Sequence, residues 1–159
     1  MTLQENLSDM TIICSGKQFP SYKVLLASRS KYFEALFRHE PRKKKVQIED
    51  TSPEIVEAMI DFMSKGLFSS DIDIKAADLI EVADKYRIEL LSKVCLTSMV
   101  DKITHDNALE TLITVEKLKH ISKSENCEKI LSFIKKEKNK IVKGENWKKH
   151  YGGLSQSGY

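Results

Sequence analysis

The sequence contains few of the residues that define several familiar protein classes. Among its 159 residues are three cysteines, three prolines and one tryptophan. Cys14, Cys95 and Cys127 form no CxxC pair and cannot all be matched in disulfides, so we expect free thiols in a reducing compartment, the nucleus and/or the cytoplasm. No window approaches the roughly 18 consecutive apolar residues of a membrane helix, and residues 1–10 lack the basic and apolar regions of a signal peptide. We therefore predict a soluble chain that does not bind a membrane.

Signatures of catalysis and of metal binding are also missing. The sequence contains no GxSxG, no P-loop and no GxGxxG. Its four histidines never stand four residues apart or beside a cysteine pair, as zinc ligands would: His39, His105, His120 and His150. The three cysteines occupy apolar positions of predicted elements, where a thiol acts as a small buried hydrophobe. We predict a non-enzyme with no catalytic residue, metal site or cofactor.

What the chain does contain is the composition of a globular domain, with 41% hydrophobic and 31% charged residues. The apolar run Met10–Cys14 is closed by Ser15-Gly16-Lys17 and answered by Gln18-Phe19, which predicts a β-hairpin. Two short helices are expected next, over 22–27 and 31–37, with residues 28–30 offering a break and an N-cap.

A third strand and three longer helices complete the predicted first domain. Val46-Gln47-Ile48 alternates as a short strand would. Thr51 offers a cap and Pro53 a first turn for a helix that runs to about Lys65 and ends at Gly66. Residues 67–74 read as an exposed loop, and amphipathic helices begin near residues 75 and 88, with Asp84 facing solvent. The result is an α+β domain over residues 1–102.

Residues 103–150 predict a helical extension that is too small to fold alone and therefore docks on the first domain. Thr104 can cap a first helix, whose apolar side comprises Ala108, Leu109, Leu112, Ile113 and Val115. Ser122 to Glu125 match a capping box, and the helix after it is expected to bury Cys127, Ile130, Leu131 and Ile134. A last short helix is expected around Ile141, Val142 and Trp147, followed by a flexible tail over 151–159.

Positive charge is concentrated in two places although the net charge is only +3. One cluster is the run 42–45, and the other is a group of lysines near the C-terminus: Lys135, Lys136, Lys138, Lys140, Lys143, Lys148 and Lys149. Basic runs can bind nucleic acid or acidic protein surfaces. No interleaved aromatic residues accompany these runs, which favours an exposed loop and a solvated helix face over a nucleic-acid site.

The order of these elements and motifs resembles the BTB/POZ family, and within it the speckle-type POZ group. The residues that support the resemblance are Ser8-Asp9, Phe19, Lys23, the run 24–30, Tyr32-Phe33, Phe37, Phe62, Gly66, Leu79, the run 83–86 and Leu90. Residues 103–150 resemble the truncated BACK, or box, helices that follow the domain in that group. No segment of the sequence resembles a MATH domain.

The resemblance implies a homodimer. Family members commonly form two-fold dimers, in which Asp9 and Lys23 match a buried acid–base pair near the dimer cleft. An acid before a buried strand also favours a cationic partner on physical grounds, whereas the alternative is that Asp9 caps a strand or turn. The apolar dimer helix of the speckle-type group is shortened here to residues 1–7. The implied dimer interface comprises Leu3, Leu7, Asp9, Lys23 and Leu26.

The resemblance also implies a substrate adaptor that binds the cullin scaffold of a RING ubiquitin ligase. The corresponding cullin-binding face comprises Phe37, Arg38, His39, Pro41, Phe68, Ser69, Asp71 and Tyr86. Residues 38–45 lack the apolar–any–glutamate motif that usually docks on the cullin, and their basic charge would repel a partner adapted to an acidic loop. The competing hypothesis is a self-associating scaffold of the transcription-regulator type without a cullin. Substrate or co-regulator proteins are the further partners expected.

Overall fold

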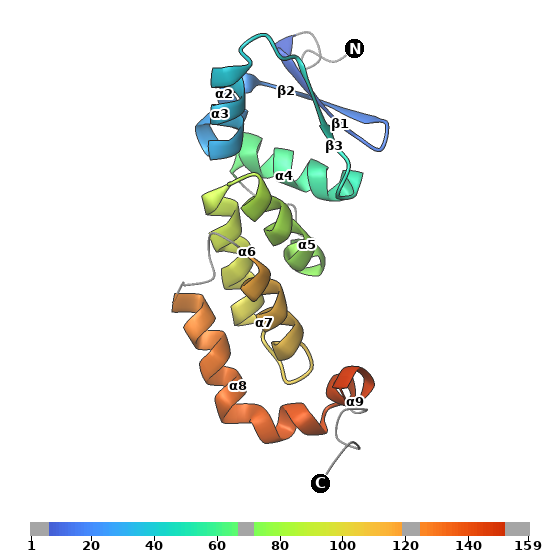
Figure 1. Ribbon diagram of the computed structural model, residues 1–159, viewed down its shortest axis with the longest axis vertical. Coiled ribbons are helices and arrows are strands. Elements are labelled where there is room, and N and C mark those ends of the chain that lie inside the picture. The colour runs from blue at the N-terminus through green and yellow to red at the C-terminus, as the bar shows by residue number, and fades with distance from the viewer. Residues whose placement is uncertain (1–6, 67–71, 119–124, 152–159) are drawn as a thin grey trace. The chain divides into compact units, whose positions relative to one another are not determined.

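The computed structural model describes residues 7–66, 72–118 and 125–151, with backbone alone at 72–75 and 150–151. The elements, labelled in Figure 1, belong to two compact units, residues 1–95 and 96–159. Helix α6 (Glu89–Asp101) contains the boundary between them. Among the described helices, none combines the length and the apolar character that a membrane span requires.

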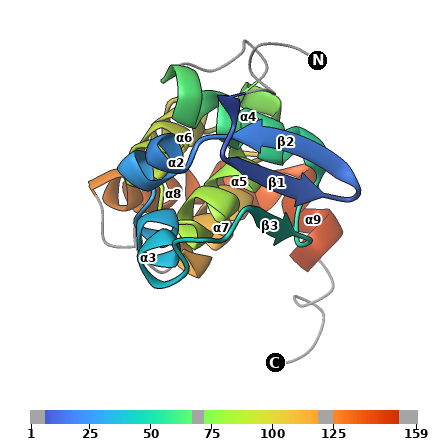
Figure 2. The same cartoon turned by 90° about the horizontal axis from the view of Figure 1, so that it is seen from above.

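The first unit is built on a three-stranded sheet in the order β2-β1-β3, with β1 in the middle (Figure 2). Strands β1 (Met10–Cys14) and β2 (Lys17–Ser21) form the predicted antiparallel hairpin, while β3 (Lys45–Ile48) pairs with β1 in parallel. Ser15 and Gly16 both have positive φ, 48° and 81°, which matches the twist of a tight hairpin. Alternation along β1 buries Met10, Ile12 and Cys14 on one face, where the core of the unit begins.

Helices α2 (Lys23–Arg29), α3 (Lys31–His39) and α4 (Pro53–Lys65) follow the predicted order. Helix α4 ends where expected, at Gly66, whose φ of 69° is left-handed and whose N–H donates to the Phe62 carbonyl. The predicted cap at Thr51 is wrong. The N-cap is Ser52, without a side-chain hydrogen bond, because Pro53 occupies the first helical position and so makes the residue before it the cap.

Helix α5 (Ile72–Lys85) begins inside the segment that was predicted to be a loop through residue 74. Repeated serine and aspartate residues favour a loop there, but aspartate is a residue type that is also favoured in the first turn of a helix. The predicted exposure of Asp84 is wrong as well, since its exposed fraction is 8%. Burial extends around most of α5, and Asp84 falls within it together with Ala76, Leu79, Ile80, Val82 and Ala83.

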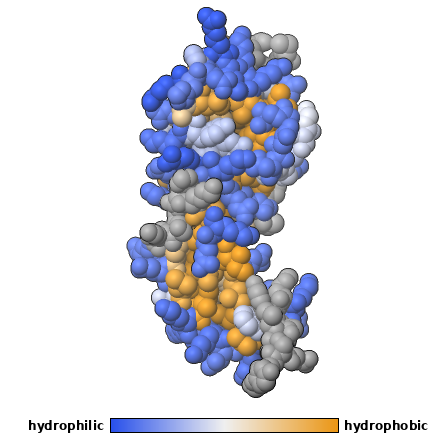
Figure 3. Space-filling model, in the orientation of Figure 1, coloured by the Kyte–Doolittle hydropathy of each residue, from blue (hydrophilic) through white to orange (hydrophobic). Residues whose placement is uncertain are grey.

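The second unit contains the C-terminal part of α6 and helices α7 (Ala108–Lys117), α8 (Glu125–Lys143) and α9 (Glu145–Tyr151). Helix α7 starts later than predicted. Thr104 and Asn107 form a reciprocal pair of hydrogen bonds before it, with 2.7 Å from the Thr104 N–H to Asn107 Oδ1 and 3.4 Å from the Asn107 N–H to Thr104 Oγ1. Ala108 and Val115 are buried as predicted, whereas Ile113 is 40% exposed. In the view of Figure 3, apolar side chains gather over α7 and α8.

Helix α8 differs from its prediction in the exposure of one apolar residue and in where the helix ends. Cys127 and Ile130 are buried, but Leu131 is 39% exposed because it lies 100° around the helix from Ile130. Ile141 and Val142, expected in a separate short helix, form the last turn of α8, and Gly144 separates them from α9. The capping box predicted at 122–125 lies largely outside the described residues. The division of the chain at residue 102 stays a prediction.

Candidate functional site

An aromatic cluster occupies the first unit between α3 and the end of α5. Phe33 is fully buried and stacks on two rings, Tyr86 at 5.6 Å and Phe37 at 5.9 Å between centroids. Tyr32 meets Phe33 and Tyr86 edge-on, at 5.3 Å and 5.0 Å. Such edge-on and offset arrangements add to the stabilisation from burial. Because α3 also carries Phe37, the cluster fixes the position of a partly exposed aromatic side chain.

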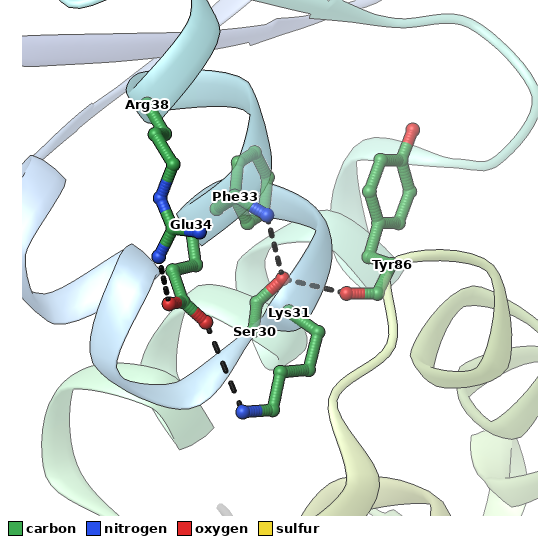
Figure 4. Close-up of polar contacts among 6 residues, drawn as sticks. All are labelled: Ser30, Lys31, Phe33, Glu34, Arg38 and Tyr86. Carbon is green, nitrogen blue, oxygen red and sulfur yellow. Dashed lines mark hydrogen bonds and ion pairs between the residues drawn. The ribbon is translucent and has the colours of Figure 1, made fainter.

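Ser30 connects this cluster to the turn after α5 (Figure 4). Its hydroxyl donates to the Tyr86 carbonyl oxygen at 2.6 Å and accepts from the Phe33 N–H at 3.1 Å, so Ser30 is the N-cap of α3 that was expected within residues 28–30. The Lys31 N–H donates to the Arg87 carbonyl oxygen at 3.3 Å. Two segments that are 56 residues apart in the sequence are therefore held together by buried hydrogen bonds.

The expected buried ion pair between Asp9 and Lys23 does not form. Asp9 Oδ1 accepts instead from the backbone N–H of Lys23, at 2.8 Å, so the carboxylate serves the first turn of α2, close to the alternative of a capping role. The Lys23 ammonium donates to the Pro41 carbonyl oxygen at 2.7 Å and lies 5.7 Å from the centre of the Phe37 ring. Both residues are partly or largely exposed, so neither charge needs a buried partner.

The other residues assigned to the dimer interface divide in the same way. Leu26 is 2% exposed and belongs to the core of its own chain, so its side chain offers almost no surface, and its place in a dimer interface stays a prediction. Leu7 is 68% exposed, and Leu3 lies outside the described residues. Sequence reasoning missed Val24, which is 73% exposed and follows directly after the lysine that Asp9 contacts. Its apolar position in a short helix resembled an ordinary core position.

The residues assigned to the cullin-binding face are partly brought together. Arg38, His39 and Pro41 are exposed at the end of α3, next to the half-buried Phe37. Tyr86, in contrast, is only 4% exposed because its ring packs in the aromatic cluster, and its assignment to a binding face stays a prediction. Phe68, Ser69 and Asp71 lie outside the described residues.

An ion pair between Asp50 and Lys85 borders the aromatic cluster. The hydrogen bond from Lys85 lowers the pKa of Asp50, and the same hydrogen bond raises the pKa of Lys85. Burial raises the pKa of the adjacent Tyr86. No local pattern predicts this pair, because its members are 35 residues apart in the sequence.

The pH dependence of stability tests this pair. A carboxyl group with a lowered folded-state pKa stabilises the fold above its unfolded pKa of about 4, and loses that contribution as the pH falls through the folded value. The side chains of Asp50 and Lys85 are 46% and 50% exposed, so solvent weakens the interaction. We expect Asp50→Asn to destabilise the protein by at most about 1 kcal/mol at neutral pH, and by progressively less toward pH ~2. Thermal unfolding of both proteins across this range measures the difference, and a pH-independent difference would contradict the interpretation.

Within residues 7–66, 72–118 and 125–151, no group of three or more His, Cys, Asp and Glu side chains is placed to hold a metal ion. None of the three cysteines forms a disulfide, and all three are buried, as predicted. Burial raises the pKa of the Cys95 thiol to about 12, which keeps it protonated and unreactive.

In each of the two basic clusters, one lysine forms an ion pair with a nearby glutamate. In the loop before β3, Lys43 pairs with Glu40 at 2.9 Å. On α8, Lys140 pairs with Glu137 at 2.8 Å, and His105 Nε2 lies 3.1 Å from the same carboxylate oxygen. These two hydrogen bonds, that of Lys140 first, lower the pKa of Glu137. Four other lysines of α8 form no ion pair with any residue that the structure describes: Lys135, Lys136, Lys138 and Lys143. This favours a solvated helix face.

A three-stranded mixed sheet with helices packed on it defines the first unit as a small α+β domain. The family model of the BTB/POZ domain matches residues 1–103, and because this is more than half of the chain, the chain belongs to the BTB/POZ domain family. BTB domains are protein-interaction modules and in general non-enzymatic, so protein–protein interaction is the function that the family assigns to this chain.

Two solved structures are similar to the first unit in fold. The BTB domain of zebrafish PATZ1 is 20% identical, with a TM-score of 0.54 over 60% of this chain and 77% of that chain. The BTB domain of human Gigaxonin is 23% identical, with a TM-score of 0.51 over 58% of this chain and 77% of that chain. At these identities the similarity shows the fold alone, and it agrees with the predicted α+β BTB/POZ fold.

Proposed function

We propose that the chain is a dimeric substrate adaptor that connects target proteins to the cullin scaffold of a RING ubiquitin ligase. The observation that carries the proposal is the exposed end of α3, where Arg38, His39 and Pro41 surround the half-buried Phe37. Stacking on Phe33 and the nearby Lys23 ammonium hold the Phe37 ring in place. A rigid aromatic side chain with a polar rim is the usual anchor of a protein–protein interface.

The resemblance of residues 103–150 to the box helices of the speckle-type POZ group supports the same role. Adaptors of that group carry such an extension after the BTB domain. The location that follows from this role is the cytoplasm and/or the nucleus.

Self-association is the second part of the proposal. Leu7 and Val24 are the most exposed large apolar side chains among the described residues, at 68% and 73%. The hydrogen bond from the Lys23 N–H to Asp9 brings the segments that carry them together. Exposed apolar side chains that gather in one place favour association, because a second copy can remove them from water.

The alternative is a self-associating scaffold that binds co-regulator proteins and no cullin. The charge of the loop between α3 and β3 favours it. Lys43 is neutralised by Glu40, but Arg42, Lys44 and Lys45 form no ion pair with any residue that the structure describes. A cullin adapted to an acidic loop would meet like charge at this position.

Purified protein and a purified cullin N-terminal domain separate these roles. We expect light scattering to give twice the chain mass of 18.2 kDa, and titration calorimetry to give a dissociation constant on the order of 1 μM. Phe37→Ala should weaken cullin binding, because it removes the proposed aromatic anchor, whereas Leu131→Ala, which shortens an exposed apolar side chain on α8, should not. Dimers that do not bind the cullin would replace the adaptor role with the scaffold role, and a mass fixed at that of one chain would refute both.

A further inference from the structure

A basic cleft lies in the first unit where the α2–α3 junction faces the α5–α6 turn. Its volume is about 550 Å³, and its charged and exposed apolar lining residues are Arg29, Lys31, Glu34, Arg87, Glu89, Leu90 and Lys93. Both walls belong to residues 1–95, so the cleft is complete within one compact unit. None of these residues was assigned to the dimer interface or to the cullin-binding face.

The cleft carries an excess of positive charge. Glu34 is already occupied, because Oε1 lies 2.8 Å from Arg38 Nη2 and Oε2 lies 3.8 Å from Lys31 Nζ, as Figure 4 shows. Arg29, Arg87 and Lys93 make no ion pair with any residue that the structure describes. The lining therefore carries Glu89 against three cations that form no ion pair with any described residue. Positively charged side chains without ion-pair partners, gathered in a concave surface, attract an anionic partner.

The two walls are held at a fixed separation. Ser30 Oγ donates to the Tyr86 carbonyl oxygen at 2.6 Å, and the Lys31 N–H donates to the Arg87 carbonyl oxygen at 3.3 Å. Arg87 has a φ of 51°, a left-handed conformation that is uncommon outside glycine, asparagine and aspartate. A binding surface with walls that do not need to be ordered loses less entropy when a ligand binds.

The rim of the cleft adds an apolar contact. Leu90 is 55% exposed, one of the more exposed large apolar side chains of the described residues. The aromatic residue of the lining, Phe62, is 2% exposed and belongs to the core, so it offers no face for stacking a nucleic-acid base. Charge beside a single apolar anchor suits a peptide better than a nucleic acid.

We propose that this cleft binds an acidic, extended segment of a partner protein, with carboxylates at Arg29, Arg87 and Lys93 and an apolar side chain on Leu90. The guanidinium groups present paired N–H donors that match carboxylate geometry. The inference does not rest on the adaptor role, because it uses neither a cullin nor a second copy of the chain.

The test uses the full chain and a short fluorescein-labelled peptide of Asp, Glu and Leu, with a matched peptide of Asn, Gln and Leu. We expect anisotropy to give a dissociation constant on the order of 10–100 μM for the acidic peptide. Arg87→Asn with Lys93→Gln should weaken binding about tenfold or more, and asparagine is chosen because it tolerates a positive φ. Lys135→Gln with Lys136→Gln changes the net charge equally on exposed α8 positions and should leave the affinity unchanged.

Circular dichroism and light scattering of each variant establish that fold and mass are retained, which separates this result from that of the proposed function. Equal binding of the neutral peptide, or an equal loss in the α8 variant, would show that the cleft is not the site. A phosphoserine peptide or a single-stranded oligonucleotide that binds in the cleft while the carboxylate peptide does not would refute the proposed ligand class. Leu90→Ser should reduce affinity without changing its dependence on salt, because it removes an apolar contact alone.

Discussion

Replacing Phe33 with alanine is expected to lower the free energy of unfolding by about 3–5 kcal/mol, the usual loss for a buried aromatic ring. Phe33 is fully buried and stacks on both Tyr86 and Phe37. Its removal leaves a cavity and separates the two rings that it joins. Urea unfolding followed by far-UV circular dichroism measures the loss, because Trp147 lies in the second unit and its fluorescence would report on that unit.

Phe33→Leu provides a graded control. Leucine keeps much of the buried volume but no ring to stack, so its cost should be clearly smaller than that of alanine. A loss below about 1 kcal/mol for Phe33→Ala would contradict the central place of this ring, since surface substitutions usually cost no more than about 0.5 kcal/mol.

Replacing Ser30 with alanine is expected to cost about 2–4 kcal/mol, because it combines the loss of a helix cap with an unsatisfied buried carbonyl. Ser30 is 1% exposed, and its hydroxyl connects the Phe33 N–H with the Tyr86 carbonyl oxygen. No water can replace the hydroxyl unless the alanine site opens. Thermal and urea unfolding measure the effect.

Ser28→Ala is the matched control for this prediction. Ser28 is two residues away and exposed, and its hydroxyl donates to the Leu25 carbonyl oxygen of its own helix at 2.9 Å. Its replacement should change stability by no more than about 0.5 kcal/mol. Similar losses at Ser28 and Ser30 would mean that the connection to Tyr86 contributes nothing measurable.

These two predictions concern neighbouring residues at the junction between α2 and α3. Phe33 positions the partly exposed Phe37 on one side, and Ser30 joins the walls of the basic cleft on the other. Variants that weaken either connection without unfolding the chain should therefore also weaken binding at the corresponding surface. The geometry of both candidate surfaces depends on the junction between α2 and α3.

Local features of the structure were predictable because they depend on neighbouring residues. The apolar run Met10–Cys14 predicts a strand, which the structure contains, and the left-handed Gly66 ends α4 as the sequence indicates. Residues 28–30 were predicted to contain a helix cap, and Ser30 is that cap, since its side chain accepts from the Phe33 N–H. The cap of α4 lies one residue after the predicted Thr51, because the preference of Pro53 for the first helical position makes Ser52 the cap.

The sequence by itself therefore determined most of the elements of this protein and the burial of its three cysteines, because backbone periodicity, capping and apolar patterning are encoded over a few residues. Its BTB/POZ fold followed from the resemblance of its motifs to that family. The tertiary structure alone decided that Leu26 and Tyr86 are buried and that Lys23 contacts Pro41 in place of the Asp9 carboxylate. It also decided that Arg29 and Lys31 face Arg87 and Lys93 across one cleft. These outcomes depend on which segments meet in space, and no pattern within a single segment contains that information.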